Sequence, residues 1–195
     1  DLDWAYPANP APLQRDHAAL AEFLKSNPNN YWALKTQCLV HMRNKAWPEL
    51  EQTATHLLQL HPTDGSEDCA RYYLSLVARF DNDTKRERQL LEDWIPHSPN
   101  AVFAYERMLE IDTEAQNWIE VLAGSRRLIG VQPLTHVPHR GMGNALEALG
   151  KPAQAITAYE KLLLTDEINP ARTHFRLADL RQTSEPELAK LHALD

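Results

Sequence analysis

Glycine is scarce in this chain, with 6 residues in 195, and cysteine is scarcer still, with 2. So few glycines disfavour a sheet-rich fold with many tight turns, and two cysteines cannot frame a small disulfide-rich domain. No run of about 18 apolar residues is present, so we expect no membrane insertion. Acidic residues outnumber lysine and arginine by 27 to 20, which disfavours a basic surface for nucleic acid.

The composition favours a folded chain, because 43% of its residues are apolar and 24% are charged. The two cysteines, Cys38 and Cys69, could form one bridge, but we favour two free thiols in or beside the core. The sequence opens at Asp1 with neither a methionine nor a signal peptide. We therefore expect a processed product or a piece of a longer protein.

Prolines recur along the chain at a nearly constant spacing. Intervals of 34, 37, 34 and 37 residues separate Pro28, Pro62, Pro99, Pro133 and Pro170. Each interval has room for two helices of about 13 to 15 residues and two tight turns. Apolar residues at three- and four-residue spacing fill these intervals, as in amphipathic helices. The pattern predicts an internal repeat of helix pairs.

A second set of prolines supports the same division, because Pro48, Pro152 and Pro186 fall in the first turn of the second helix of a pair. A missing N–H costs nothing at that position. We predict an extended proline-rich linker over 1–12 and a helical repeat domain over 13–195, which opens with an unpaired helix from Leu13 to Ser26. About eleven helices result, with repeat units near 31–62, 66–99, 101–133, 136–170 and 171–195.

One unit resembles the tetratricopeptide repeat (TPR) in detail, and the others keep its spacing. The residues that carry the resemblance are His139, Met142, Gly143, Leu146, Ala155, Tyr159, Leu162 and Pro170. Gly143 and Ala155 stand where the two helices of such a repeat come closest, and Gly150 suits a left-handed helix cap. The resemblance implies an all-α, right-handed superhelical solenoid of antiparallel helix pairs.

Motifs of catalysis and cofactor binding are missing from the sequence. No glycine-rich phosphate loop, Gly-x-Ser-x-Gly elbow or His-Glu-x-x-His zinc motif occurs. His136 and His139 could share a helix face as metal ligands, but Pro138 lies between them and no third ligand is near, so packing is the favoured role. We predict that the chain is no enzyme and that it uses no cofactor or metal.

A solenoid of helix pairs presents the first helix of each pair on its concave wall. The exposed positions on that wall are, unit by unit, Trp32, Lys35, Leu39, Met42 and Arg43; Cys69, Tyr72, Leu76, Arg79 and Phe80; Phe103, Glu106, Glu110 and Glu114; Val137, Arg140, Asn144 and Glu147; and Arg172, Phe175, Asp179 and Gln182. Such a groove suits a protein or peptide partner. Our candidate partner-binding residues are Trp32, Lys35, Met42, Arg43, Tyr72, Arg79, Phe80, Phe103, Arg140 and Asn144.

Within this set we expect Lys35, Arg43 and Arg79 to be solvated charges that steer an acidic peptide onto the aromatic residues. The resemblance also suggests a comparison with the carboxylate clamp of some TPR proteins, in which lysine and asparagine stand one turn apart on successive first helices. Lys35 fits the first place, but Leu39 stands where asparagine is wanted. Arg140 and Asn144 reproduce the pair in the fourth unit.

These observations favour a protein-interaction scaffold that binds a peptide or partner domain in its concave groove. Two alternatives stay open. The chain could be an accessory domain of a larger enzyme, since its last unit resembles repeat arrays fused behind peptidase or other catalytic domains. It could also self-associate through its terminal helices, because Leu188, Leu191 and Leu194 have no following repeat to cover them.

Overall fold

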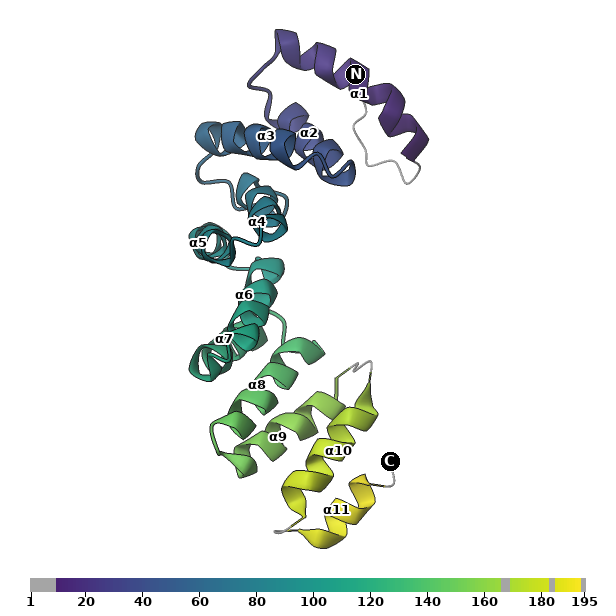
Figure 1. Ribbon diagram of the computed structural model, residues 1–195, viewed down its shortest axis with the longest axis vertical. Coiled ribbons are helices and arrows are strands. Elements are labelled where there is room, and N and C mark those ends of the chain that lie inside the picture. Colours follow the sequence, from purple (N-terminus) through teal and green to yellow (C-terminus); the bar gives the residue numbers. More distant parts are fainter. Residues whose placement is uncertain (1–9, 166–168, 183–184, 194–195) are drawn as a thin grey trace. The chain divides into compact units, whose positions relative to one another are not determined.

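The computed structural model describes residues 10–165, 169–182 and 185–193, and within these ranges it contains helices and no strand (Figure 1). The all-α prediction is therefore confirmed for the described residues. The elements are α1 (Pro10–Ser26), α2 (Tyr31–Arg43), α3 (Trp47–Leu60), α4 (Ala70–Phe80), α5 (Thr84–Trp94), the 3-10 helix η1 (Ile95–His97), α6 (Val102–Glu114), α7 (Trp118–Val131), α8 (His136–Ala148), α9 (Pro152–Leu163), α10 (Pro170–Arg181) and α11 (Pro186–His192).

The chain divides into two compact units, residues 1–101 and 102–195, where the sequence predicts one continuous array. The first unit contains α1 to α5 and η1, and the second contains α6 to α11. The division falls after Pro99, one of the prolines that mark the repeat spacing.

Helix α1 begins at Pro10, three residues before the predicted start at Leu13 and inside the stretch predicted to be an extended linker. Proline is well suited to the first position of a helix, because it lacks an N–H that would have no partner there. The remainder of the predicted linker, residues 1–9, lies outside the described residues.

Each of the first four helix pairs is joined by the same tight turn. A residue in the left-handed region closes the first helix of the pair: Lys45 (φ 55°), Asn82 (φ 58°), Gln116 (φ 56°) and Gly150 (φ 68°). The residue after it donates a backbone hydrogen bond of 2.9 Å to the carbonyl five residues earlier, as from Lys151 to Leu146. This is the Schellman cap, and it reverses the chain so that the paired helices run antiparallel. The cap predicted at Gly150 is confirmed.

Prolines open helices in this structure. Pro152, Pro170 and Pro186 are the first residues of α9, α10 and α11, and Pro48 is the second residue of α3. The predicted role of Pro48, Pro152 and Pro186 is therefore confirmed. Pro170, which the sequence reading placed at the end of the fourth unit, starts the first helix of the fifth.

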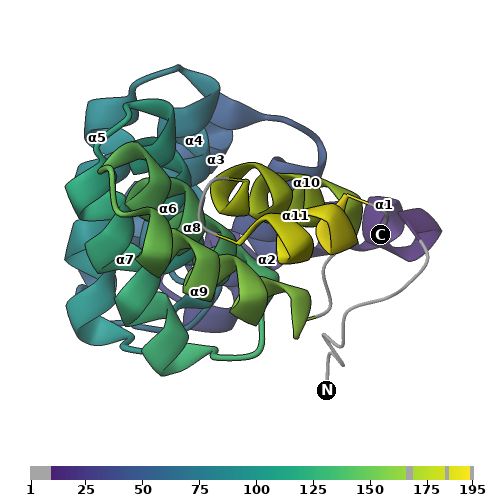
Figure 2. The same cartoon turned by 90° about the horizontal axis from the view of Figure 1, so that it is seen from below.

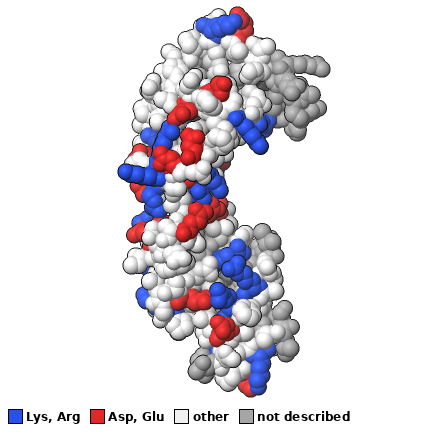
Figure 3. Space-filling view, viewed as in Figure 1, with Lys and Arg blue, Asp and Glu red and all other residues white. Residues whose placement is uncertain are grey.

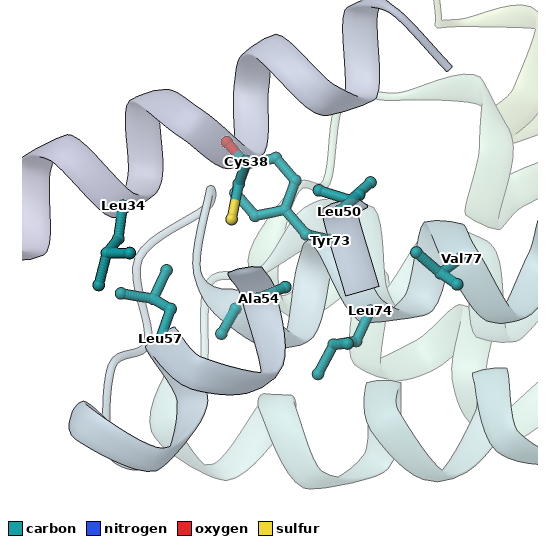
Figure 4. Packing of buried hydrophobic residues seen from close by; sticks show 9 residues of the cluster. Leu34, Cys38, Leu50, Ala54, Leu57, Tyr73, Leu74 and Val77 are labelled. Carbon is teal, nitrogen blue, oxygen red and sulfur yellow. The ribbon is translucent and has the colours of Figure 1, made fainter. Parts of the chain in front are cut away.

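The core of the first unit is shared by α2, α3 and α4 (Figure 4). Leu34 and Cys38 on α2 point into the same interior as Leu50, Ala54 and Leu57 on α3 and Tyr73, Leu74 and Val77 on α4. Their three- and four-residue spacing along each helix produces the buried faces. Neither cysteine forms a disulfide, and both are buried, so the favoured reading of two free thiols is confirmed.

The second unit is packed in the same manner, with α8 lying beside both α6 and α7 (Figure 2). One cluster joins Leu109, Val121, Leu128 and Ala145, and the next joins Leu146, Ala155, Ala158, Tyr159, Leu162 and Leu177. The predicted close approach at Gly143 and Ala155 is confirmed, because Gly143 packs against the ring of Tyr159 and Ala155 is fully buried.

Candidate functional site

The first helices of two successive pairs in the second unit, α6 and α8, border an open groove of about 330 Å³. Its lining combines three carboxylates, one guanidinium, one amide and an apolar floor. The lining residues are Glu106, Leu109, Glu110, Thr113, Glu114, Val137, Arg140, Gly141 and Asn144. Six of these nine are wall positions that the sequence predicts for the third and fourth units, so the register of both helices is as expected.

The α6 wall of the groove is acidic. Glu106, Glu110 and Glu114 follow one another at four-residue spacing and so share one helix face. The buried guanidinium of Arg107 donates a hydrogen bond of 2.8 Å to Glu110 Oε2 and lies 3.8 Å from Glu114 Oε1. Arg107 thus partly neutralises two of the three carboxylates. In Figure 3, acidic side chains gather over and beside α6, and basic side chains lie near the start of α8.

Glu106 is the carboxylate that Arg107 does not reach. It is half-buried, and no hydrogen bond or ion pair of its side chain is found in the described part of the chain. Burial raises the pKa of Glu106, the charge of Glu110 raises it further, and the charge of His136 opposes them. A cation beside Glu106 would favour its ionised form and so offset both effects.

The α8 wall is built on a glycine. A Cβ at Gly141 would lie 2.8 Å from the Ser125 hydroxyl on α7 and 3.2 Å from a methyl group of Leu109 on α6. Glycine therefore lets α8 approach α6 and α7 closely enough to form the groove floor. One turn further along, the Tyr159 hydroxyl lies 2.9 Å from Asn144 Oδ1 and 2.9 Å from Glu147 Oε2. The contact with Tyr159 holds the Asn144 amide at the groove wall.

Three predicted partner-binding residues belong to this unit. Arg140 and Asn144 line the groove, half-buried, whereas Phe103 at the start of α6 is half-buried and outside the lining. Sequence reasoning did not select Leu109, Thr113 or Gly141. A signal for Gly141 was present, since a glycine in the middle of a helix indicates a close packing partner.

In the first unit, the predicted solvated charge at Lys35 is wrong. Lys35 is 6% exposed and forms an ion pair with Asp68. It also donates hydrogen bonds to the Ser66 hydroxyl at 3.0 Å and to Tyr31 Oη at 3.2 Å. Because the α3–α4 loop folds over this ammonium group, Lys35 ties α2 to the loop and is not available to steer a ligand.

The same loop is fixed by a second carboxylate. Asp64 accepts a hydrogen bond of 2.9 Å from Tyr31 Oη and one of 2.9 Å from the Ser66 backbone N–H. Burial acts to raise the pKa of Asp64, but these hydrogen bonds outweigh it and lower the pKa overall. The two networks share Tyr31 and Ser66, so they act as one partly buried polar cluster that anchors residues 61–69.

The predicted aromatic residues of the first unit have different environments. Trp32 is 68% exposed. Tyr72 contacts the ring of Tyr73 and packs against the core. Phe80 stacks on Trp47 at a centroid separation of 4.8 Å, yet remains 56% exposed. Trp32 and Phe80 therefore retain surface for a ligand, while Tyr72 serves mainly in packing.

The other predicted residues of this unit lie at the ends of the first helices. Arg43 and Arg79 are exposed at the ends of α2 and α4. Met42 is half-buried and packs against the core cluster. These contacts do not test whether the first unit binds a partner. The role of Trp32, Arg43, Arg79 and Phe80 in partner binding therefore stays a prediction.

His139, one of the two histidines considered as metal ligands, is buried, and its Nε2 lies 2.9 Å from the Pro133 carbonyl oxygen. That bond ties the start of α8 to the preceding loop, as the favoured packing role implies. Among the described residues, no group of three or more His, Cys, Asp or Glu side chains could hold a metal ion. None of the described helices has the length and apolar character needed to span a bilayer.

The fold is shared with solved TPR proteins. YrrB, a TPR protein with an unusual peptide-binding site, superposes with a TM-score of 0.70 at 11% sequence identity, covering 91% of this chain and 93% of that one. MamA from Desulfovibrio magneticus RS-1 gives a TM-score of 0.65 at 14% identity, covering 82% and 88%. PilF of Pseudomonas aeruginosa gives 0.61 at 16% identity, covering 82% and 72%.

No protein-family sequence model matches the chain, and no curated protein matches it by sequence. The structural similarity nevertheless establishes the fold: the chain is a TPR-like solenoid of antiparallel helix pairs. The expectation drawn from the resemblance at Gly143, Ala155 and Tyr159 is confirmed at the level of the fold.

Proposed function

We propose that this chain is a non-catalytic protein-interaction scaffold that holds an extended segment of a partner protein in the groove between α6 and α8. The observation that carries the proposal is the groove itself, which offers an apolar floor between two polar walls. Ligand sites in proteins commonly combine a mostly apolar lining with a few placed polar groups. The peptide-binding site named for YrrB belongs to a protein of the same fold, and it adds analogy to this argument.

The size and openness of the groove favour a peptide over a small cofactor. A groove of about 330 Å³, open to solvent along α6 and α8, accommodates a few side chains of an extended chain. Leu109 and Val137 supply apolar contact, while Asn144 and the carboxylates of α6 can bind peptide groups and charged side chains. Alternation of apolar and polar contacts is what an extended peptide presents.

A groove-filling variant tests the proposal. We expect the immobilised chain to retain members of a random, end-blocked heptapeptide pool, and Thr113→Trp to abolish retention because the indole occupies the groove. Ile119→Trp is the matched control, since Ile119 on α7 is 72% exposed and outside the groove. Equal retention by wild type and Thr113→Trp, with melting temperatures unchanged, would show that peptides bind elsewhere or not at all.

A second candidate function is self-association at the end of the second unit. A groove of about 410 Å³ lies between α10 and α11, and the exposed side chain of Phe175 borders it. Leu188 and Leu191 on α11 are also exposed, as the sequence predicts, while Leu194 lies outside the described residues. Sedimentation velocity would test this candidate: concentration-dependent dimers that Phe175→Glu removes favour it, and a monomer at about 100 μM excludes it. The role as an accessory domain of a larger enzyme stays a prediction.

A further inference from the structure

The carboxylates of the α6–α8 groove differ in how they are neutralised. Arg107 donates to Glu110 and lies near Glu114, so these two carboxylates already have a cationic neighbour. Glu106 stands one turn before Glu110 on the same face, half-buried at the groove wall, with no hydrogen bond or ion pair found in the described ranges. The groove therefore holds a carboxylate whose solvation is reduced and which forms no ion pair with the described residues, although the charge of His136 acts on it.

The opposite wall places no side chain in an ion pair with Glu106 among the described residues, and the charge of His136 at the start of α8 does not outweigh burial and Glu110. Arg140 lines α8, but no ion pair joins it to Glu106 within the described residues. Three carboxylates line the groove against the guanidinium groups of Arg140 and of Arg107 behind the wall, so the negative charge still exceeds the positive and an incoming cation is favoured over an anion. Leu109 and Val137 lie on the floor beside them, and apolar surface near an ion pair reduces its screening by water.

We propose that the α6–α8 groove selects peptide segments that carry a lysine or arginine side chain, which pairs with Glu106 while the adjoining residues of the peptide lie over Leu109 and Val137. The inference rests on the proposed peptide-binding function and adds its specificity. The acidic peptide expected on Lys35, Arg43 and Arg79 concerns the first unit, whereas this preference concerns a groove of the second unit.

The aliphatic stem of a lysine or arginine matches the floor as well as the wall. Such a stem packs along apolar surface while its charged end reaches a polar group, which suits a carboxylate that stands beside Leu109. The Asn144 amide on the other wall, fixed by Tyr159, can bind the peptide backbone. Backbone contacts give affinity without sequence preference, so the preference for a basic residue is expected to depend on Glu106.

The test uses the full chain and pools of N-acetylated, C-amidated random heptapeptides whose central residue is fixed as lysine, arginine, glutamate or norleucine. We expect wild type to retain the lysine and arginine pools about three- to tenfold more than the norleucine pool, and the glutamate pool least. Glu106→Gln should lower the ratio of basic to norleucine retention to about one. Glu120→Gln on α7, outside the groove lining, is the matched control and should leave that ratio as in wild type.

Charge reversal gives the proposal a second test. Glu106→Lys should retain the glutamate pool above the lysine pool, because the wall then carries a cation. Retention of peptides by wild type without a preference for basic residues, or with one that Glu106→Gln leaves unchanged, overturns the inference and leaves the proposed function standing. If no pool is retained above the level of Thr113→Trp, the proposed function fails and this inference fails with it.

Discussion

The ring of Tyr159 on α9 occupies the space that a side chain at Gly143 on α8 would need. A Cβ built at position 143 would lie 2.4 Å from Cε1 and 2.7 Å from Cδ1 of that ring. Both residues are buried, and the Tyr159 hydroxyl is held by Asn144 and Glu147 on α8. The ring cannot move away without taking its hydroxyl, which has one proton to donate, away from these two acceptor oxygens, so the contact fixes the distance between α8 and α9.

Gly143→Ala should therefore destabilise the protein. The added methyl group must displace the ring or separate the helices, which costs about 1–3 kcal/mol, and urea denaturation would measure the loss. The matched control is Gly130→Ala on α7, where a Cβ would meet no atom within 4 Å. We expect that control to be neutral or stabilising by up to about 1 kcal/mol, because alanine favours the helix. Equal effects of both substitutions would contradict the contact.

The repeat architecture could be predicted from the sequence because its signals are local. Proline spacing places the turns between helix pairs, and the pair Gly143 and Ala155 places the closest helix contact. The turns within the pairs are harder to locate, since the left-handed residue is a lysine at position 45 and a glutamine at position 116. Only Gly150 and, less strongly, Asn82 are residue types that favour this conformation. The cost of these conformations is offset by the repeated cap hydrogen bonds, which no single sequence position reveals.

The candidate site was predictable in part for the same reason. Helical spacing correctly placed Glu106 and Glu110 on one face of α6, and Arg140 and Asn144 on one face of α8, since that depends on the helix period alone. The error at Lys35 arose because Asp68 and Ser66 belong to a loop more than 30 residues away, and long-range pairing cannot be read from periodicity. The contact of Arg107 with Glu110, which distinguishes Glu106, also requires the structure.

Lys35→Met should destabilise the first unit much more than Arg43→Met. The first change leaves Asp68 without its cation and breaks hydrogen bonds to Ser66 and Tyr31, for a cost of about 1–3 kcal/mol because Asp68 is partly exposed. Arg43 is exposed on the same helix, so its replacement should cost less than about 0.5 kcal/mol. Denaturant midpoints measure both, and similar losses would show that the Lys35 cluster contributes little.

The same cluster predicts a loss of stability at alkaline pH. Burial acts to lower the pKa of Lys35, but hydrogen bonds to Asp68 and Tyr31 outweigh it and raise the pKa above the ordinary value of 10.5. The stabilisation from the charged Lys35 is thus fully present below pH 10.5 and disappears as the pH rises through the pKa of Lys35 in the folded protein. Unfolding midpoints of wild type and Lys35→Met should converge above that pH, and a constant difference would contradict the assignment.

Asp64 predicts a separate loss of stability in acid. Its pKa is lowered from the ordinary value of 3.8 by hydrogen bonds from Ser66 and Tyr31, which outweigh the opposite effect of burial. The stabilisation from the ionised Asp64 is therefore complete above pH 3.8 and is lost as the pH falls through the pKa of Asp64 in the folded protein. Asp64→Asn should flatten this part of the stability profile relative to wild type. An unchanged slope between about pH 4 and pH 2 would exclude the contribution.

At the left-handed cap residues, a substitution to glycine should stabilise the protein, and a substitution from glycine should destabilise it. Gln116→Gly should raise the free energy of unfolding by up to about 1 kcal/mol, because glycine adopts φ 56° without the clash that a Cβ introduces. Gly150→Ala should lower it by about 1 kcal/mol, although a Cβ there meets no atom within 4 Å, because φ is 68°. Thermal unfolding measures both. A stabilised Gly150→Ala would show that the turn does not need a left-handed residue.

The two thiols should be unreactive in the folded protein. Burial raises the pKa of Cys38 to about 12, with a further contribution from the charge of Asp68, and burial raises the pKa of Cys69 to about 11. The thiolate is the reactive species, so at pH 8 its fraction at Cys38 is only ~10⁻⁴, and burial also keeps reagents away.

A disulfide reagent that releases a coloured thiolate can measure this protection. In native buffer at pH 8 we expect almost no colour within minutes, and in 6 M guanidinium, on the order of the concentration that unfolds most domains, two thiols per chain should react at once. Cys38→Ser and Cys69→Ser should each release one thiol in denaturant, which assigns the signal. Rapid reaction of the folded wild type would contradict the burial of these residues, and no reaction in denaturant would indicate a disulfide between them.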